Sequence, residues 1–128
     1  MSTDADKRTI LIAEDEPDIR DLVSFRLERA GYDVILAEDG QEALELAIEH
    51  RPDLAILDVM MPRMDGLELT RRIRAEQTIA AMPIILLTAS VQDQAVTEGF
   101  RAGADDYMRK PFSPQELLSR VEAVLGRK

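Results

Sequence analysis

Acidic side chains follow two short apolar runs of the chain, at the positions where a buried strand would end. Glu14 and Asp15 come directly after the run Thr9–Ala13, and Asp58 follows the run Leu54–Leu57. An acid at such a position is either a solvated strand terminus or a reactive carboxylate. The carboxyl ends of parallel strands meet at one edge of a sheet, where ligands bind in such folds. If the sheet is parallel, these three carboxylates therefore lie close together.

A hydroxyl and an ammonium group follow two further strand-like runs. Thr88 ends the run that starts at position 83, and Lys110 comes after the run 105–109. Lys110 is one of three lysines in a chain that otherwise uses arginine, and lysine is a compact point charge that can contact a phosphate oxygen. A carboxylate nucleophile, a cation, a hydroxyl and an ammonium group are what phosphoryl transfer requires, because that chemistry rests on positioning and charge neutralisation.

Three carboxylates at one partly dry edge repel one another, and a divalent cation is the simplest relief of that repulsion. Hard cations prefer oxygen ligands, and magnesium takes one or two carboxylates together with waters and phosphate oxygens. The chain has no cysteine, and its single histidine, His50, is expected to be a solvated residue at a helix end. We therefore expect Mg²⁺ at this edge rather than a softer metal.

Five strand-like runs alternate with five helical segments. The predicted strands span residues 9–13, 33–37, 54–58, 83–88 and 105–109. The predicted helices lie around residues 17–30, 43–48, 67–73, 92–102 and 114–126. Strands rich in Val, Ile and Leu that alternate with amphipathic helices indicate an α/β protein with a parallel sheet covered on both faces. Right-handed crossovers place all the strand ends on one side of that sheet.

The bulk composition predicts one acidic domain. The chain has 128 residues, 45% of them hydrophobic, and a formal net charge of −9, which suits a single core. The scarcity of basic residues disfavours direct contact with nucleic acids and with anionic membranes. No apolar run approaches the length of about 20 residues that spans a bilayer. Met1–Arg8 is expected to be a flexible polar tail without a signal peptide, so we expect a cytoplasmic protein.

Four segments together resemble the receiver domain of two-component response regulators. They are Ala13-Glu14-Asp15-Glu16, Leu57-Asp58-Val59-Met60-Met61-Pro62, Leu87-Thr88-Ala89, and Gly103-Ala104-Asp105-Asp106-Tyr107 with Lys110-Pro111-Phe112. Intervals of 43, 30 and 22 residues between Asp15, Asp58, Thr88 and Lys110 fit this family without a long insertion. The resemblance extends from about Thr9 to Leu125, which is nearly the whole chain.

The resemblance implies a flavodoxin-like doubly wound (βα)5 sandwich over residues 9–126, with a five-stranded parallel sheet in the order 2-1-3-4-5. It implies that Asp58 accepts a phosphoryl group from a phosphohistidine on a histidine kinase or a histidine phosphotransfer protein. Magnesium would be held by Asp15 and Asp58, by Glu14 through water, and by the main-chain carbonyl of Met60. Many family members have Asp where this chain has Glu14, so we expect an altered metal geometry.

The resemblance also assigns roles around the phosphoryl group. Lys110 and Thr88 would contact it, and Lys110, with a cis peptide bond after it, would pair with Asp58 at rest. Tyr107 would turn inward as Thr88 moves. Such a protein is not an enzyme with a separate substrate but a phosphoacceptor that assists its own phosphorylation and dephosphorylation. We further expect the apolar Met60 to restrict the attacking water and so to tune the lifetime of the acyl phosphate.

The segment Gly103–Val124 resembles receivers that are joined to winged-helix DNA-binding domains, so the expected target is a downstream protein or a missing C-terminal output domain. Those receivers form phosphorylation-dependent dimers through the fourth helix, fifth strand and fifth helix. Asp106 and Arg120 could supply one ion pair of that kind. Val96 stands where a basic residue is usual, which leaves Glu116 without its mate and argues against the family's dimer.

The predicted fourth helix has few apolar residues, and Gly99 costs it about 1 kcal/mol. It is interpreted either as a poorly packed surface helix or as a bistable element that phosphorylation shifts. Its Val96 and Phe100 lie one turn apart and could form an apolar patch for a partner.

Three other functions fit parts of this pattern. A phosphatase of the haloacid dehalogenase type needs a second acid two residues after its nucleophile, where this chain has Met60. A flavin carrier would need a hydroxyl-rich phosphate loop after the first strand, where Glu14-Asp15-Glu16 would repel a phosphate. A pseudo-receiver would act only as an interaction module, and the retention of all five site residues argues against it.

Overall fold

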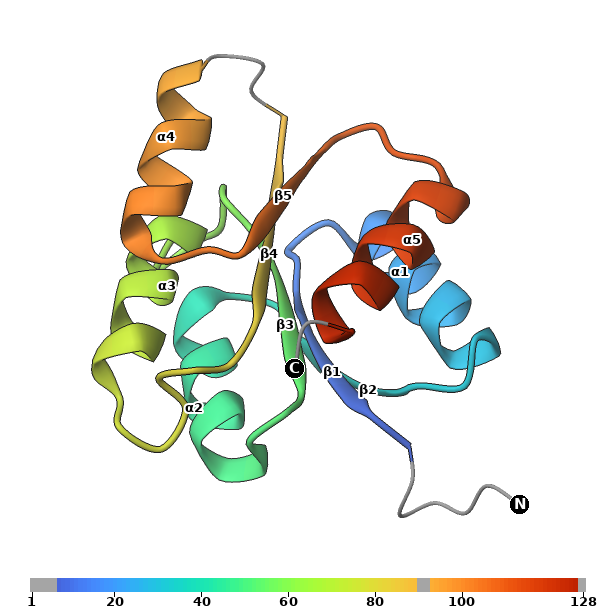
Figure 1. Cartoon of the computed structure of the whole chain (residues 1–128), viewed down its shortest axis with the longest axis horizontal. Coiled ribbons are helices and arrows are strands. Elements are labelled where there is room, and N and C mark those ends of the chain that lie inside the picture. The colour runs from blue at the N-terminus through green and yellow to red at the C-terminus, as the bar shows by residue number, and fades with distance from the viewer. Residues whose placement is uncertain (1–6, 90–92, 127–128) are drawn as a thin grey trace.

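Ten helices and strands alternate along the chain in the computed structural model, which describes residues 7–89 and 93–126 (Figure 1). They are β1 (Thr9–Ala13), α1 (Pro17–Arg29), β2 (Asp33–Ala37), α2 (Gly40–His50), β3 (Leu54–Asp58), α3 (Gly66–Ala75), β4 (Ile84–Thr88), α4 (Asp93–Ala102), β5 (Asp106–Arg109) and α5 (Pro114–Leu125). Every strand pairing is parallel, and the strand order in the sheet is β2-β1-β3-β4-β5. The predicted flavodoxin-like α/β sandwich is therefore confirmed.

Helices cover both faces of the sheet, with α1 and α5 on one side and α2, α3 and α4 on the other (Figure 1). Successive residues of a strand point to opposite faces, so the central strands β1, β3 and β4 contribute to two separate cores. Ile10 and Ile56 belong to the core beneath α1 and α5, whereas Leu11 and Leu57 belong to the core beneath α2 and α3. Burial on both faces explains why these strands are apolar at almost every position.

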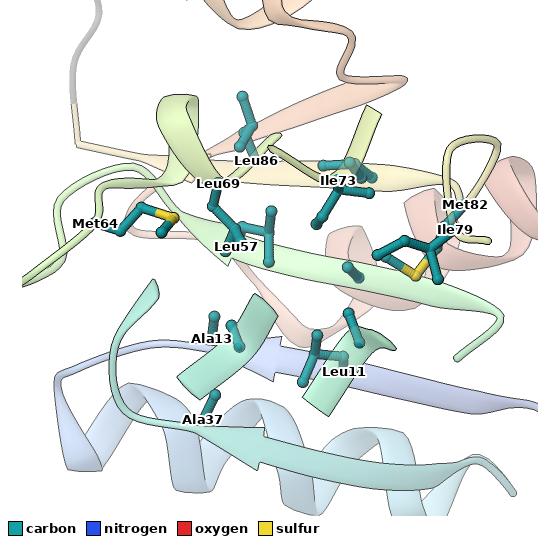
Figure 2. Packing of buried hydrophobic residues seen from close by; sticks show 14 residues of the cluster. Leu11, Ala13, Ala37, Leu57, Met64, Leu69, Ile73, Ile79, Met82 and Leu86 are labelled. Carbon is teal, nitrogen blue, oxygen red and sulfur yellow. The ribbon is translucent and has the colours of Figure 1, made fainter. Parts of the chain in front are cut away.

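The core beneath α2 and α3 supports the strand that ends in Asp58. Figure 2 shows Leu57 of β3 and Leu86 of β4 gathered with Leu69 and Ile73 of α3. All four side chains are buried, and complete burial of a large apolar side chain contributes about 1.5–3 kcal/mol. This packing holds the carboxyl end of β3 in place.

Two strand boundaries differ from the predicted ones. β4 begins at Ile84 rather than at Pro83, because proline has no N–H to donate to the ladder. β5 begins at Asp106 rather than at Asp105. The Asp105 carboxylate there accepts the N–H of Ile84 at 2.8 Å, so a side chain takes part in joining the two strands where the ladder begins.

Some of the predictions fall outside the described residues. α4 begins at Asp93, and Gln92, its predicted first residue, lies outside the described part of the chain. The same holds for residues 1–6 of the predicted tail, whereas Lys7 and Arg8 are described and exposed. Over residues 7–89 and 93–126, no helix has the length and apolar character needed to cross a membrane.

Candidate functional site

Four of the predicted site residues lie at the carboxyl edge of the sheet. Asp58 is the last residue of β3 and Thr88 the last residue of β4, while Glu14 and Lys110 come directly after β1 and β5. Glu14, Asp58 and Thr88 are buried, with exposed fractions of 0%, 4% and 6%. The predicted convergence is confirmed, and Asp58 is not the solvated strand terminus that was the other interpretation.

The Lys110 ammonium group bridges the acids of this edge. Its Nζ atom lies 2.8 Å from Oε1 of Glu14, 3.1 Å from Oδ2 of Asp58 and 3.8 Å from Oε1 of Glu16. The main-chain N–H of Lys110 donates to the main-chain carbonyl of Thr88 at 2.8 Å, and the peptide bond after Lys110 is cis. The pair with Asp58 matches the resting contact that the resemblance implies. The shorter contact with Glu14 was not predicted.

Burial shifts the protonation equilibria of this group. Desolvation raises the pKa of Glu14 to about 7, the contact with Lys110 lowers that pKa, and the neighbouring Asp58 raises it. Burial alone would lower the pKa of Lys110, but the close contact with the Glu14 carboxylate and the charge of Asp58 outweigh it, so the pKa is raised. Lys110 therefore stays protonated at neutral pH, whereas Glu14 is close to its titration midpoint.

Glu14, Asp15 and Asp58 are arranged as a metal ion would require. One carboxylate oxygen from each lies within 4.8 Å of the other two. Asp15 is exposed whereas Glu14 and Asp58 are buried, so the group of three acids is open to solvent on one side. Oε1 of Glu14 is buried and, among the described residues, accepts no hydrogen bond of good geometry, so its close polar contact is the Lys110 ammonium. An oxygen-only set with an incompletely satisfied carboxylate fits Mg²⁺.

Met60 stands at the rim of the site. Its N–H donates to Oδ1 of Asp58 at 3.3 Å, and its side chain is 73% exposed. The position two residues after Asp58 therefore carries an apolar side chain in contact with water, not the second acid of a dehalogenase-type phosphatase. The Met60 carbonyl as a metal ligand stays a prediction.

Two residues that sequence reasoning did not identify support the site. Gly66, the first residue of α3, donates its N–H to the carbonyl of Val59 at 2.9 Å and packs against the main chain of Asp58. Arg20 of α1 donates from Nη1 to the main-chain carbonyl of Glu14 at 2.9 Å. The one sequence signal for Gly66 was its place just before a predicted helix, and nothing distinguished Arg20 from the other arginines.

Thr88 and Tyr107 line the same small cavity beneath α4. The cavity measures about 10 Å³, which is barely the space of one water molecule. Val96 and Gly99 of α4 also line it. The Tyr107 ring packs edge-on against Phe100, with ring centroids 5.9 Å apart and planes at 86°. Of the two residues expected to form an apolar patch on α4, Phe100 is 45% exposed and Val96 is half-buried.

Arg120 of α5 forms its ion pairs within the chain. Its Nη1 lies 3.0 Å from Oδ2 and 3.1 Å from Oδ1 of Asp106, and its Nε lies 3.2 Å from Oε2 of Glu116. Glu116, whose usual basic partner on the fourth helix is replaced by Val96, binds Arg120 one helical turn further along α5, and the expected lack of a mate in the dimer stays a prediction. Within a single copy of the chain, Arg120 therefore already binds both Asp106 and Glu116, the acids expected to make contacts between subunits.

The family profile of the response regulator receiver domain matches residues 10–122. The alkaline phosphatase synthesis transcriptional regulatory protein PhoP of Bacillus subtilis is 47% identical over 120 residues, which are 94% of this chain and 49% of that protein. The DNA-binding dual master transcriptional regulator RpaA of Synechocystis sp. is 48% identical over 118 residues, which are 92% of this chain and 49% of that protein. The chain spans about half the length of the curated relatives it matches.

Solved structures are similar over nearly their whole length. The chemotaxis protein CheY4 of Vibrio cholerae has a TM-score of 0.88 and 37% identity, covering 92% of this chain and 98% of that one. The receiver domain of the sensor histidine kinase PA1611 of Pseudomonas aeruginosa, solved with a magnesium ion in its active site cleft, has a TM-score of 0.87 and 34% identity, covering 94% and 98%. The chain therefore belongs to the response regulator receiver domain family of two-component signal transduction.

Proposed function

We propose that Asp58 is the phosphoacceptor and that its phosphoryl group comes from a phosphohistidine on a histidine kinase or a histidine phosphotransfer protein. A carboxylate oxygen of Asp58 attacks phosphorus, the phosphorus–nitrogen bond breaks, and the imidazole leaves after taking a proton from solvent. The observation that carries this proposal is the burial of Asp58 with Lys110 at 3.1 Å. A buried, charge-paired carboxylate at this edge of the sheet is a nucleophile already held in position.

Lys110 and Thr88 are proposed to bind the transferred group. The raised pKa of Lys110 keeps its ammonium charged, so it can neutralise a phosphoryl oxygen once Asp58 has become the acyl phosphate. The Thr88 hydroxyl can donate one hydrogen bond to another phosphoryl oxygen. Both residues lie at the same sheet edge as Asp58, and phosphoryl transfer depends mainly on such positioning.

Glu14, Asp15 and Asp58 are the residues that would hold Mg²⁺, with Glu14 acting through water and the Met60 carbonyl as a further ligand. When bound, the ion neutralises negative charge that develops on the transferring phosphoryl group. The support in this chain is the oxygen-only donor set and the buried Oε1 of Glu14.

The protein is proposed to be a phosphoacceptor rather than an enzyme with a separate substrate. The groups that receive the phosphoryl group also assist its later loss to water. Met60 is exposed at the rim of the site, where an apolar side chain limits how water approaches the aspartyl phosphate. The lifetime of the phosphorylated state is thereby set within the chain itself.

Phosphorylation is proposed to act on the surface formed by α4, β5 and α5. A movement of Thr88 toward the phosphoryl group would vacate space beneath α4, which Tyr107 would then enter. The present cavity of about 10 Å³ is far too small for a phenol ring, so the inward turn of Tyr107 requires Thr88 or α4 to move first. The exposed Phe100, packed on Tyr107, would change its surroundings at the same time.

Residues 9–126 are proposed to be the receiver unit of a cytoplasmic regulator. Its target would be a C-terminal output domain or a downstream protein, because the chain spans about half of its curated relatives. The net charge of −9 speaks against direct contact of this unit with nucleic acids or membranes. A phosphorylation-dependent dimer through α4, β5 and α5 would have to exchange the contacts between Asp106 and Arg120 for contacts between subunits.

The proposal is tested by the intact mass of the chain after incubation with MgCl2 and phosphoramidate, a small donor with a phosphorus–nitrogen bond. We expect one added phosphoryl group on the parent and none when EDTA replaces magnesium. An Asp58→Asn variant, similar in size and still polar, should gain no mass. If the parent neither gains mass nor binds magnesium, the interaction-module alternative replaces the proposal.

A further inference from the structure

We infer that Arg20 is a positioning residue for the metal-binding acids, an inference that rests on the proposed function. Arg20 lies on the first turns of α1, and its side chain is half-buried. Its Nη1 donates to the main-chain carbonyl of Glu14 at 2.9 Å. This bond spans the turn between β1 and α1, which carries both Glu14 and Asp15.

The turn has few other restraints. The N–H of Glu14 donates to the carbonyl of Ala37 at 3.1 Å, and the N–H of Glu16 donates to Oε2 of Glu14 at 3.1 Å. Glu16 is the N-cap of α1, but its side chain makes no capping hydrogen bond. The guanidinium of Arg20 therefore secures the carbonyl end of Glu14, whereas the other bonds secure its N–H and its carboxylate.

The carbonyl of Glu14 belongs to the same peptide plane as the N–H of Asp15. Because that plane is rigid, a donor that fixes the carbonyl oxygen fixes ψ of Glu14 and φ of Asp15 together. These two angles determine the directions from which both carboxylates reach the site. A planar guanidinium suits this task because its donors are held in a fixed fork.

The charge of Arg20 and its hydrogen bond have opposite effects on a cation. A positive charge near Glu14 and Asp15 repels Mg²⁺, so the loss of that charge alone would strengthen magnesium binding. Loss of the bond to the Glu14 carbonyl releases the turn and weakens magnesium binding, as the loss of groups that orient metal ligands usually does. The direction of the change in affinity therefore separates the two roles.

The experiment measures the dissociation constant for MgCl2 by isothermal titration calorimetry in the parent, Arg20→Gln, Arg20→Lys and Arg26→Gln. Arg26 is exposed on the same helix, so Arg26→Gln makes the same charge change away from the turn. We expect Arg20→Gln to bind magnesium about 10-fold more weakly than the parent. Arg20→Lys should also weaken binding although it keeps the charge, and Arg26→Gln should bind at least as tightly as the parent.

Urea unfolding in EDTA accompanies each titration, so that a loss of affinity is read only from folded protein. If Arg20→Gln destabilises the fold too far, Arg20→Lys carries the test. Binding by the Arg20 variants that equals the parent's or exceeds it would overturn the inference. Failure of the parent itself to bind magnesium would instead overturn the proposed function, and the inference with it.

Discussion

Gly66 lies so close to Asp58 that their main chains touch. A Cβ atom at position 66 would stand 2.4 Å from the carbonyl oxygen of Asp58 and 3.0 Å from its carbonyl carbon. Neither atom is the end of a flexible side chain, so the segment that carries Asp58 would have to move. The start of α3 thus packs against the main chain of the proposed phosphoacceptor and fixes its position.

A Gly66→Ala variant should therefore be both less stable and slower to phosphorylate. Overpacking of this kind lowers the free energy of unfolding by about 2 kcal/mol. A displaced nucleophile should slow phosphorylation by phosphoramidate by about 10-fold or more. Gly31→Ala is the control, because Gly31 has a φ of +101° and no atom near its Cβ position. Gly31→Ala should lower the free energy of unfolding but leave the phosphorylation rate of the folded protein unchanged. Equal phosphorylation rates for the two variants would refute the positioning of Asp58 by Gly66.

Lys110 should matter for stability as well as for chemistry. Its ammonium lies between the buried carboxylates of Glu14 and Asp58, so Lys110→Met would leave them without this positively charged partner. We expect the free energy of unfolding in EDTA at pH 8 to fall by about 3 kcal/mol, and MgCl2 to restore part of the loss. Lys7→Met, which removes an exposed pair with Asp33 at 3.8 Å, should cost less than about 1 kcal/mol. Equal losses in both variants would contradict this role.

Stability should depend on pH through Glu14. The pKa of Glu14 is about 7 in the folded chain and 4.5 as its ordinary value, so the folded state binds the proton more tightly. The stability contributed by Glu14 is then fully present below pH 4.5 and is lost as the pH rises through about 7. Urea unfolding in EDTA at several pH values, compared with Glu14→Gln, measures this contribution. The parent should lose stability relative to the variant between pH 4.5 and 7, and a constant or rising difference would be incompatible with a raised pKa.

The lifetime of the phosphorylated state should depend on Met60. Its side chain is exposed at the rim of the site, so Met60→Asn replaces an apolar group by one that can hold the attacking water. We expect dephosphorylation to become about fivefold faster, which corresponds to about 1 kcal/mol in the barrier. Met60→Leu, which keeps an apolar side chain, should retain the parent rate. The decay of the added phosphoryl mass after removal of the donor measures the dephosphorylation rates of both variants. An unchanged rate for Met60→Asn would count against a role of Met60 in restricting water.

Most of the fold could be predicted because hydrophobic pattern and turn residues agree along the chain. β1, β2 and β3 were predicted with their observed boundaries, since each is a run of apolar residues bounded by charged or turn residues. β5 is one residue shorter than predicted, although Asp105 contacts Ile84 of β4 through both its N–H and its carboxylate. The convergence of Glu14, Asp58 and Lys110 followed from parallel strands alone.

The rest of the site depends on distances that no sequence pattern encodes. The contact between Lys110 and Glu14 is shorter than that between Lys110 and Asp58, which follows from the length and direction of the glutamate side chain. Arg120 binds Asp106 and Glu116 within one chain because the first turns of α5 lie beside β5. Residue types alone could not show that these groups satisfy one another.

The position of the phosphoryl group on the chain decides whether Asp58 is the phosphoacceptor. The protein is phosphorylated with phosphoramidate and MgCl2, reduced with borohydride, which converts an aspartyl phosphate to homoserine, and mapped by peptide mass spectrometry. We expect homoserine at position 58, with Asp15 and Glu14 unchanged. Homoserine at another acid, or its persistence in the Asp58→Asn variant, would contradict the assignment of Asp58 as the phosphoacceptor.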